Sequence, residues 1–237
     1  MLPRADDSRL GIERPAAASS ACELLLGGER LLLLPERAVW WPAGGTLFVA
    51  DLHWGKEAAF RAAAIPIPDG LEADLQRLSV LLAKTQAQRL VVLGDLQHSR
   101  SGRTPHGESL IERWCESVAG VELVLVRGNH DRSAGDPPTA WGFRTCAEPL
   151  SCGPWELWHH PPSLTSARSA GLAGHLHPAF LLKRGPDRLR LPGYWLRGGV
   201  LVLPAFGTFT GQLPVQRAAD DEAFVIAAER VIRLPGH

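Results

Sequence analysis

Apolar residues occur along this chain in short runs separated by polar segments, and the period of each run predicts a strand or a helix. Two apolar runs around a Gly-Gly pair, CELLLGGERLLLL at 22–34, predict a β-hairpin. The continuous runs TLFVA at 46–50, LVVLG at 90–94 and VELVLV at 121–126 predict buried strands. Each of these three strands is followed directly by polar residues.

Two helices are expected between these strands. Segment 68–86 has leucines at helical spacing, namely Leu71, Leu75, Leu78 and Leu82. In segment 104–120, Thr104 is a candidate N-cap and Pro105 suits the first turn. The apolar face of this second helix is expected to bury Leu110, Ile111, Trp114 and Val118.

Beyond a Pro- and Gly-rich loop at 133–143, the sequence is rich in strands. Strand patterns occur at 155–161, 171–184, 189–206 and 222–234. This order predicts an α/β sandwich, in which two mixed sheets pack together with helices outside. The chain has no internal repeat and no clear linker, so a single domain is expected over residues 21–237. Residues 1–20, rich in Ala, Ser, Arg and Pro, are expected to form a loose, disordered tail.

Composition places the chain among ordinary globular proteins, with 45% hydrophobic and 21% charged residues in 237. Its formal net charge is zero, which argues against an extended basic surface for duplex DNA. The amino terminus lacks the apolar core of a signal peptide, and no apolar run approaches the ~20 residues of a membrane span. The four cysteines have no C-x-x-C spacing. These features predict a reduced, cytoplasmic protein without a membrane segment.

Five apolar runs end in side chains that can bind a metal ion. These are Asp51 and His53, Asp95, Asn129 and His130, His159 and His160, and His175 and His177. Six of the nine histidines fall in these clusters, which scattered surface histidines would not do. Ligands in α/β proteins gather beyond the carboxyl ends of strands, so we expect one metal site there. Each cluster alone could be a polar turn, and the five together favour the metal site.

The order D-x-H, G-D, G-N-H-D, H and G-H-x-H resembles the pattern of the calcineurin-like metallophosphoesterases over residues 46–207. The chain is also similar to the bacterial ligase-associated metallophosphoesterases, which are proposed DNA-repair endonucleases. The stretches that carry this second similarity are ADLHWGKEAAFRAAAIPIP, LVLVRGNHDRSAGDPP, LAGHLHPA and LPAFGTFTG. The resemblance implies a four-layer α/β/β/α sandwich and a dinuclear metal centre.

The resemblance also implies roles for individual residues. Ligands of one metal would be Asp51, His53, Asp95 and His177. Ligands of the other would be Asp95, Asn129, His159 and His175, with Asp95 as the bridge. In the His159-His160 pair the family pattern points to the first histidine as the ligand. His130 resembles the catalytic histidine of the family, and it can protonate a leaving oxygen.

Mixed imidazole and carboxylate ligands suit Mn, Fe, Zn or Co better than Mg or Ca, and the resemblance favours Mn²⁺. The leading hypothesis is a metal-dependent phosphoesterase that hydrolyses phosphodiester bonds by a two-metal mechanism, with DNA as substrate and a DNA ligase or helicase as repair partners. One alternative is the same chemistry on nucleotides or other small phosphoesters. Another is a scaffold protein that keeps the fold without catalysis.

Several further residues near these motifs have two possible roles. Asp131 either orients His130 or caps the next turn. His98 and Lys56 are candidates for contact with the metal ligands or the substrate. Four arginines near the predicted rim could bind phosphates or remain solvated, namely Arg100, Arg103, Arg127 and Arg132. Three tryptophans could stack on bases or lie in the core, namely Trp40, Trp41 and Trp54.

Overall fold

A computed structural model describes residues 20–57, 60, 70–163, 170–184 and 187–236. The tail expected at 1–20 lies outside the described residues except for Ser20, and the single domain over 21–237 remains a prediction. None of the described helices is long and apolar enough to cross a membrane. The four cysteines all lie in the described part and are unpaired.

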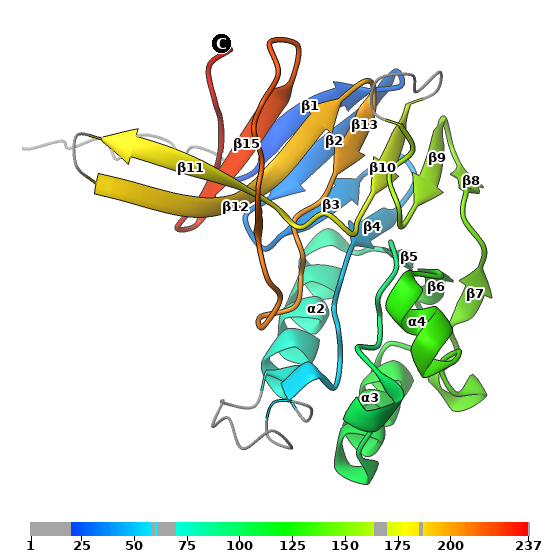
Figure 1. The fold of residues 1–237 in the computed structure, drawn as a ribbon. Coiled ribbons are helices and arrows are strands. Elements are labelled where there is room, and N and C mark those ends of the chain that lie inside the picture. The colour runs from blue at the N-terminus through cyan, green and yellow to red at the C-terminus, as the bar shows by residue number, and fades with distance from the viewer. Residues whose placement is uncertain (1–19, 58–59, 61–69, 164–169, 185–186, 237) are drawn as a thin grey trace, which may run out of the picture.

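The first sheet has seven strands that follow one another in chain order (Figure 1). They are β1 (Cys22–Leu26), β2 (Glu29–Leu34), β3 (Ala38–Trp41), β4 (Thr46–Val49), β5 (Arg89–Val92), β6 (Glu122–Val126) and β7 (Arg144–Cys146). The strands from β1 to β4 are antiparallel, and those from β4 to β7 are parallel. The helices α2 (Leu71–Thr85) and α3 (Pro105–Ser117) connect the parallel strands.

The second sheet is also mixed and has nine strands. They are β8 (Leu150–Cys152), β9 (Trp155–Trp158), β10 (Gly171–Ala173), β11 (Pro178–Arg184), β12 (Asp187–Arg197), β13 (Val200–Val202), β14 (Leu213–Pro214), β15 (Glu222–Ala227) and β16 (Arg230–Arg233). Strand β10 lies parallel between β9 and β13. Further short elements of the described chain are α4 (Asn129–Ala134) and the 3₁₀ turns η1 (Arg100–Gly102) and η2 (Thr139–Trp141).

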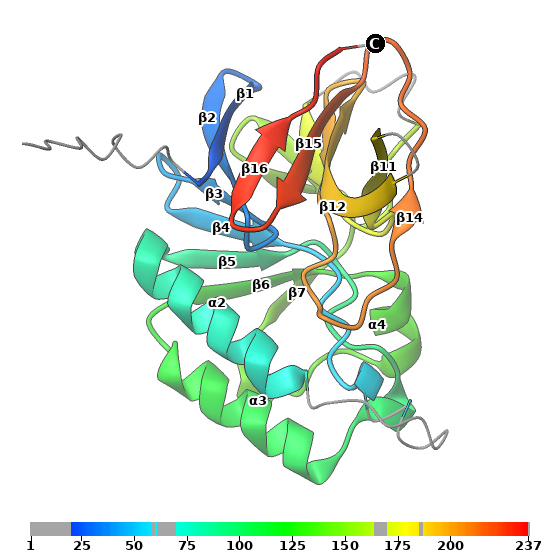
Figure 2. The ribbon, with the colours of Figure 1, turned by 90° about the vertical axis from the view of Figure 1, so that its left-hand side faces the viewer.

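The two sheets pack face to face, and α2 and α3 cover the outer face of the first sheet (Figure 2). Alternate residues of one strand point to opposite faces, so Phe48 lies between the sheets while Leu47 and Val49 pack against the helices. The predicted α/β pair of packed mixed sheets is confirmed. Within the described residues, the outer face of the second sheet carries a smaller apolar cluster, in which Phe180 and Trp195 pack with Val215 and Leu234.

Local sequence signals explain most of the longer elements. Gly27 and Gly28 both have positive φ, as a tight two-residue hairpin turn requires. The hydroxyl of Thr104 accepts the backbone N–H of Gly107, and Pro105 is the first residue of α3. The predicted hairpin, both helices and the strands that precede the polar clusters are therefore confirmed. Strands β3, β7, β8 and β14 and helix α4 lie where the sequence patterns predicted no element.

Candidate metal centre

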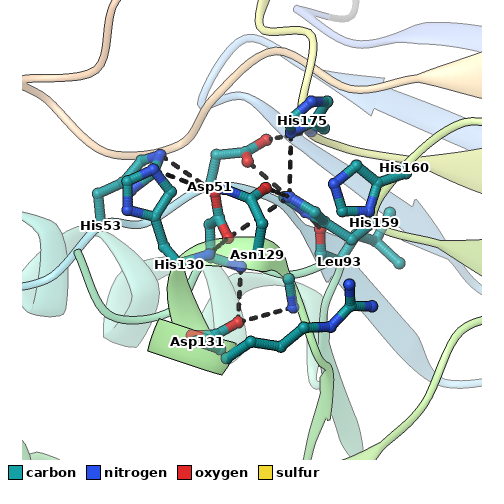
Figure 3. Close-up of polar contacts among 12 residues, drawn as sticks. Asp51, His53, Leu93, Asn129, His130, Asp131, His159, His160 and His175 are labelled. Carbon is teal, nitrogen blue, oxygen red and sulfur yellow. Dashed lines mark hydrogen bonds and ion pairs between the residues drawn. The ribbon is translucent and has the colours of Figure 1, made fainter. Parts of the chain in front are cut away.

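The clusters of metal-binding side chains meet at one edge of the two sheets (Figure 3). Asp51 and His53 follow β4, Asp95 follows β5, and Asn129 begins the helix after β6. From the second sheet, His159 follows β9, and His175 and His177 follow β10. The parallel strands of each sheet therefore bring residues far apart in sequence to a common edge.

The distances between side chains divide this cluster around Asp95. One of its carboxylate oxygens lies 3.4 Å from His159 Nε2, and the other lies 3.7 Å from His53 Nε2. On the first side, His159 Nε2 is also 3.0 Å from Asn129 Oδ1 and 3.2 Å from His175 Nδ1. On the other side, Asp51 Oδ1 lies 3.2 Å from His177 Nε2.

The backbone is strained at most of these positions. Eight non-glycine residues in the described chain have positive φ, and five of them belong to the cluster: Asp51, His53, Asp95, His175 and His177. A left-handed conformation is costly for a residue with a Cβ, and such strain concentrates at functional sites. His175 and His177 are not alternate residues of one strand, because both have positive φ. They lie in the loop between β10 and β11, and that loop's turns direct both to the site.

Backbone carbonyls fix the orientation of three imidazoles. The Nδ1 atoms of His130, His159 and His177 lie 2.7, 3.0 and 3.1 Å from the carbonyl oxygens of His98, Leu93 and Gly211. A carbonyl oxygen can only accept a hydrogen bond, so each Nδ1 is the donor and carries a proton in these contacts. Burial lowers the pKa of His159 to about 4, so this ring is neutral and its Nε2 lone pair faces the site. Histidines that bind metals are held in this way.

The electrostatics of the cluster match a cation site. Asp51 and Asp95 are both buried, and burial together with the Asp51 charge raises the pKa of Asp95 to about 7. Burial lowers the pKa of His53 to about 2 and that of His159 to about 4, so both rings are neutral at physiological pH. Asp51 and Asp95 are close to one another and beside neutral imidazoles. Both carboxylates can be ionised at once only if a positive charge lies near them.

Unpaired buried atoms support the same interpretation. Asp51 Oδ1, His177 Nε2 and His53 Nδ1 are shielded from solvent and have no hydrogen-bond partner in the described structure. Asp51 Oδ1 and His177 Nε2 face one another at 3.2 Å without a hydrogen bond. Buried polar atoms are normally satisfied, so exceptions of this kind indicate a missing ligand. The residues present therefore fit a divalent metal centre.

The two histidines of the His159-His160 pair have different surroundings. His159 is fully buried, and its Nε2 points at Asn129 and Asp95. His160 instead places its Nδ1 2.8 Å from Glu148 Oε1. Glu148 also accepts the backbone N–H groups of both histidines, at 2.8 Å each. Sequence reasoning missed Glu148, which lies in a short loop with no recognisable motif.

The Gly-Asn-His-Asp segment begins a helix and is not a simple turn. Asn129 is the first residue of α4, and Gly128 before it is extended, with φ of −89° and ψ of −178°. Gly128 is therefore not needed for a left-handed turn. Its requirement is space, because a Cβ there would lie 2.2 Å from Asp95 Oδ1. Asp131 caps α4 by accepting the Gly128 N–H, and no hydrogen bond joins it to His130 in the described structure.

The remaining candidates lie around a cavity of about 260 Å³ beside the cluster. His98, His130 and Lys56 line this cavity together with several of the ligand candidates. The His98 ring stacks on His130, with 5.0 Å between the ring centroids. Three of the four candidate arginines form ion pairs with acids: Arg103 with Glu108, Arg127 with Asp136, and Arg132 with Glu148. Trp54 is buried in the core, as one alternative expected, while Trp40 and Trp41 are partly buried.

Comparison with known proteins agrees with this geometry. The family model for Calcineurin-like phosphoesterase matches residues 46–186, which is more than half of the chain. A crystal structure of the nuclease MPE from Pseudomonas putida is 38% identical with a TM-score of 0.79, and the match covers 90% of this chain and 100% of that one. The phosphoesterase Yfce from E. coli is 17% identical over 81% of this chain and 99% of its own. Its TM-score is only 0.39.

No curated protein matches the chain. The family match and the nuclease structure are sufficient to assign the family, because the matched region contains all five clusters of candidate ligands. They support a hydrolase and not a scaffold protein. The chain belongs to the calcineurin-like phosphoesterase family.

Proposed function

We propose that this phosphoesterase is a metal-dependent nuclease that hydrolyses phosphodiester bonds of DNA with two divalent cations. The observation that carries the proposal is the position of Asp95, whose two carboxylate oxygens face two different ligand groups. A carboxylate placed in this way suits a bridge between two cations, because it offers one oxygen to each and offsets their repulsion.

The ligand groups are assigned from the contacts around Asp95. Asp51, His53, Asp95 and His177 would hold one cation. Asp95, Asn129, His159 and His175 would hold the other. The Asn129 amide adds an oxygen ligand without adding charge, and mixed nitrogen and oxygen donors suit Mn²⁺, Fe, Zn or Co. We propose Mn²⁺, as the ligase-associated resemblance implies. Bound cations lower the pKa of water and stabilise the charge that develops on a phosphoryl group.

His130 is assigned as the proton donor to the leaving oxygen. Its Nδ1 is engaged by the His98 carbonyl at 2.7 Å, so Nε2 is the nitrogen that can carry a proton to the substrate. The ring is partly exposed and lines the cavity beside the ligand cluster. A general acid contributes typically about 10²–10⁴-fold to a rate, so His130→Ala should lose activity on that scale while metal binding persists.

DNA is proposed as the substrate because the similar Pseudomonas putida structure is a nuclease and aligns over its whole length. The zero net charge is compatible with local contact to a strand end or single strand, and with delivery by a ligase or helicase in the cytoplasm. One observation favours the alternative of nucleotides or small phosphoesters. Three of the four candidate arginines near the site are already paired with acidic side chains, which reduces the positive charge that these arginines offer to a long nucleic acid.

A nuclease assay with a metal screen tests the proposal. Single-stranded DNA, duplex DNA and bis-p-nitrophenyl phosphate are each incubated with the protein and Mn²⁺, Zn²⁺, Co²⁺ or Mg²⁺. We expect DNA cleavage with Mn²⁺, its loss in Asp95→Ala, and its retention in the exposed-acid control Asp220→Ala. Cleavage of the small ester alone would favour the alternative substrate. Equal cleavage by Asp95→Ala would contradict the metal centre.

A further inference from the structure

Asp131 is a buried carboxylate that contacts two loops of the site. Its side chain is fully buried, and it accepts the backbone N–H groups of Asp95 at 2.8 Å, Gln97 at 3.1 Å and Gly128 at 2.9 Å. The first two donors belong to the loop after β5, and the third belongs to the loop after β6. Figure 3 shows Asp131 apart from the imidazoles, on the side of the cluster formed by α4. One carboxylate therefore holds the two loops together, although Asp131 lies 36 residues from Asp95 and 34 residues from Gln97 in sequence.

A second hydrogen bond runs between the same loops in the opposite sense. The backbone N–H of His130 donates to Asp95 Oδ1 at 2.9 Å. The backbone of Asp95 is thus held by Asp131, and its side chain is held by the residue that precedes Asp131. Gly128 lets the loops approach, because a Cβ there would lie 2.5 Å from the Asp95 backbone nitrogen. These contacts fix the Asp95 carboxylate relative to Asn129 and His130.

We infer that Asp131 is a positioning residue, whose carboxylate sets the place of Asp95 between its two ligand groups. Both Asp131 oxygens are used, since Oδ2 accepts from Asp95 and Gly128 and Oδ1 accepts from Gln97. An asparagine at this position would have nearly the same shape, but its NH₂ group would face an N–H donor. The role of orienting the His130 ring is not needed, because the His98 carbonyl holds its Nδ1.

The inference rests on the proposed metal centre and is tested by metal binding as well as by activity. The variant is Asp131→Asn, and the matched control is Asp221→Asn. Asp221 is also buried and also accepts a backbone N–H, from Ala218 at 2.7 Å, but it lies by the turn before β15 in the second sheet. Mn²⁺ affinity and stoichiometry are measured by titration calorimetry, and melting temperature is measured in chelator.

Both variants should melt at a lower temperature than the wild type. Only Asp131→Asn should bind Mn²⁺ more weakly, by about 10–100-fold, because the loss of a group that orients a ligand typically has this effect. Equal Mn²⁺ affinity in Asp131→Asn and wild type would overturn the inference and leave the proposed function intact. A wild type that binds no Mn²⁺ would instead contradict the proposed function.

A measurement on the wild type covers the case in which Asp131→Asn does not fold. Amide hydrogen exchange of the metal-free protein is followed by NMR for Asp95, Gln97 and Gly128. The reference is Ala119, an exposed residue whose N–H donates only to the Glu116 carbonyl in the described structure, at 3.3 Å. Amides that donate to a buried carboxylate should exchange more slowly than that reference. Exchange at the rate of Ala119 would show that Asp131 does not hold these loops.

Discussion

Gly128 is required for space at the proposed metal centre, since its φ of −89° is open to any residue. A Cβ at this position would lie 2.2 Å from Asp95 Oδ1 and 2.5 Å from the Asp95 nitrogen, so either loop must shift. We expect Gly128→Ala to lose about 1–3 kcal/mol of stability, as overpacking typically does, and to weaken Mn²⁺ binding. Denaturant unfolding and metal titration measure the two effects. The control is Gly120→Ala, where a Cβ would meet nothing within 4 Å.

His159 and His160 are adjacent in sequence and should differ in function. His159 is fully buried with Nε2 toward Asn129, whereas His160 pairs with Glu148. His159→Ala should therefore lower the metal content measured by elemental analysis, with loss of one cation from the site that His159 completes. His160→Ala should keep both cations. Full metal content in His159→Ala, or loss of a cation from His160→Ala alone, would reverse the assignment.

The N-terminus of α3 offers a test at the scale of a single element. The Thr104 hydroxyl accepts the Gly107 N–H at 3.1 Å, which satisfies one of the free donors at the start of the helix. Thr104→Ala should cost about 1 kcal/mol of unfolding free energy, and Thr104→Ser should cost almost nothing because the hydroxyl remains. Chemical denaturation measures both variants. An alanine variant as stable as the serine variant would refute the role of the cap.

Elements with a strong local signal were predictable, and those without one were not. Helix α2 has leucines on one face over its 15 residues, and β5 is a continuous apolar run, so both follow from sequence. Helix α4 has only six residues and forms inside the ligand motif, so it has no apolar period. Strands β7 and β8 have three residues each. Strand β7 pairs with β6, which is distant in sequence, and β8 pairs with β9 across a tight turn. Their hydrogen bonds depend on the packed sheets.

The whole molecule determines how the separate clusters become one site. The identity of the ligand candidates followed from the polar residues at five strand ends, which a single sequence displays. Their mutual arrangement did not, because it depends on how two sheets pack and on the loop conformations that follow β4, β5 and β10. Glu148 illustrates the limit. It holds both histidines of the His159-His160 pair, yet only the folded chain brings it to them.

The metal-free protein should lose stability in mild acid. Burial lowers the pKa of four histidines in or beside the cluster: His53, His98, His159 and His175. A lowered pKa means that the unfolded chain binds a proton that the folded chain does not, so stability present above the ordinary pKa of 6.5 is lost as pH falls. Asp95, Asp131 and His177 have a raised pKa and act in the opposite sense.

The lowered groups outweigh the raised ones between about pH 6.5 and pH 5. His53, His98 and His159, with pKa values of about 2, 4 and 4, stay neutral in the folded chain over this range, whereas Asp95, with a pKa of about 7, takes up a proton. His177 adds little below its ordinary pKa of 6.5, because the unfolded chain is then protonated as well. Denaturant unfolding in chelator at about pH 7 and about pH 5 should therefore give a lower unfolding free energy at the lower pH. His53→Asn removes one of the four lowered groups, so its unfolding free energy should fall less than that of the wild type over the same range. If the wild type were equally stable at both pH values, the buried imidazoles would not be held neutral, and their role as ready metal ligands would lose its electrostatic basis.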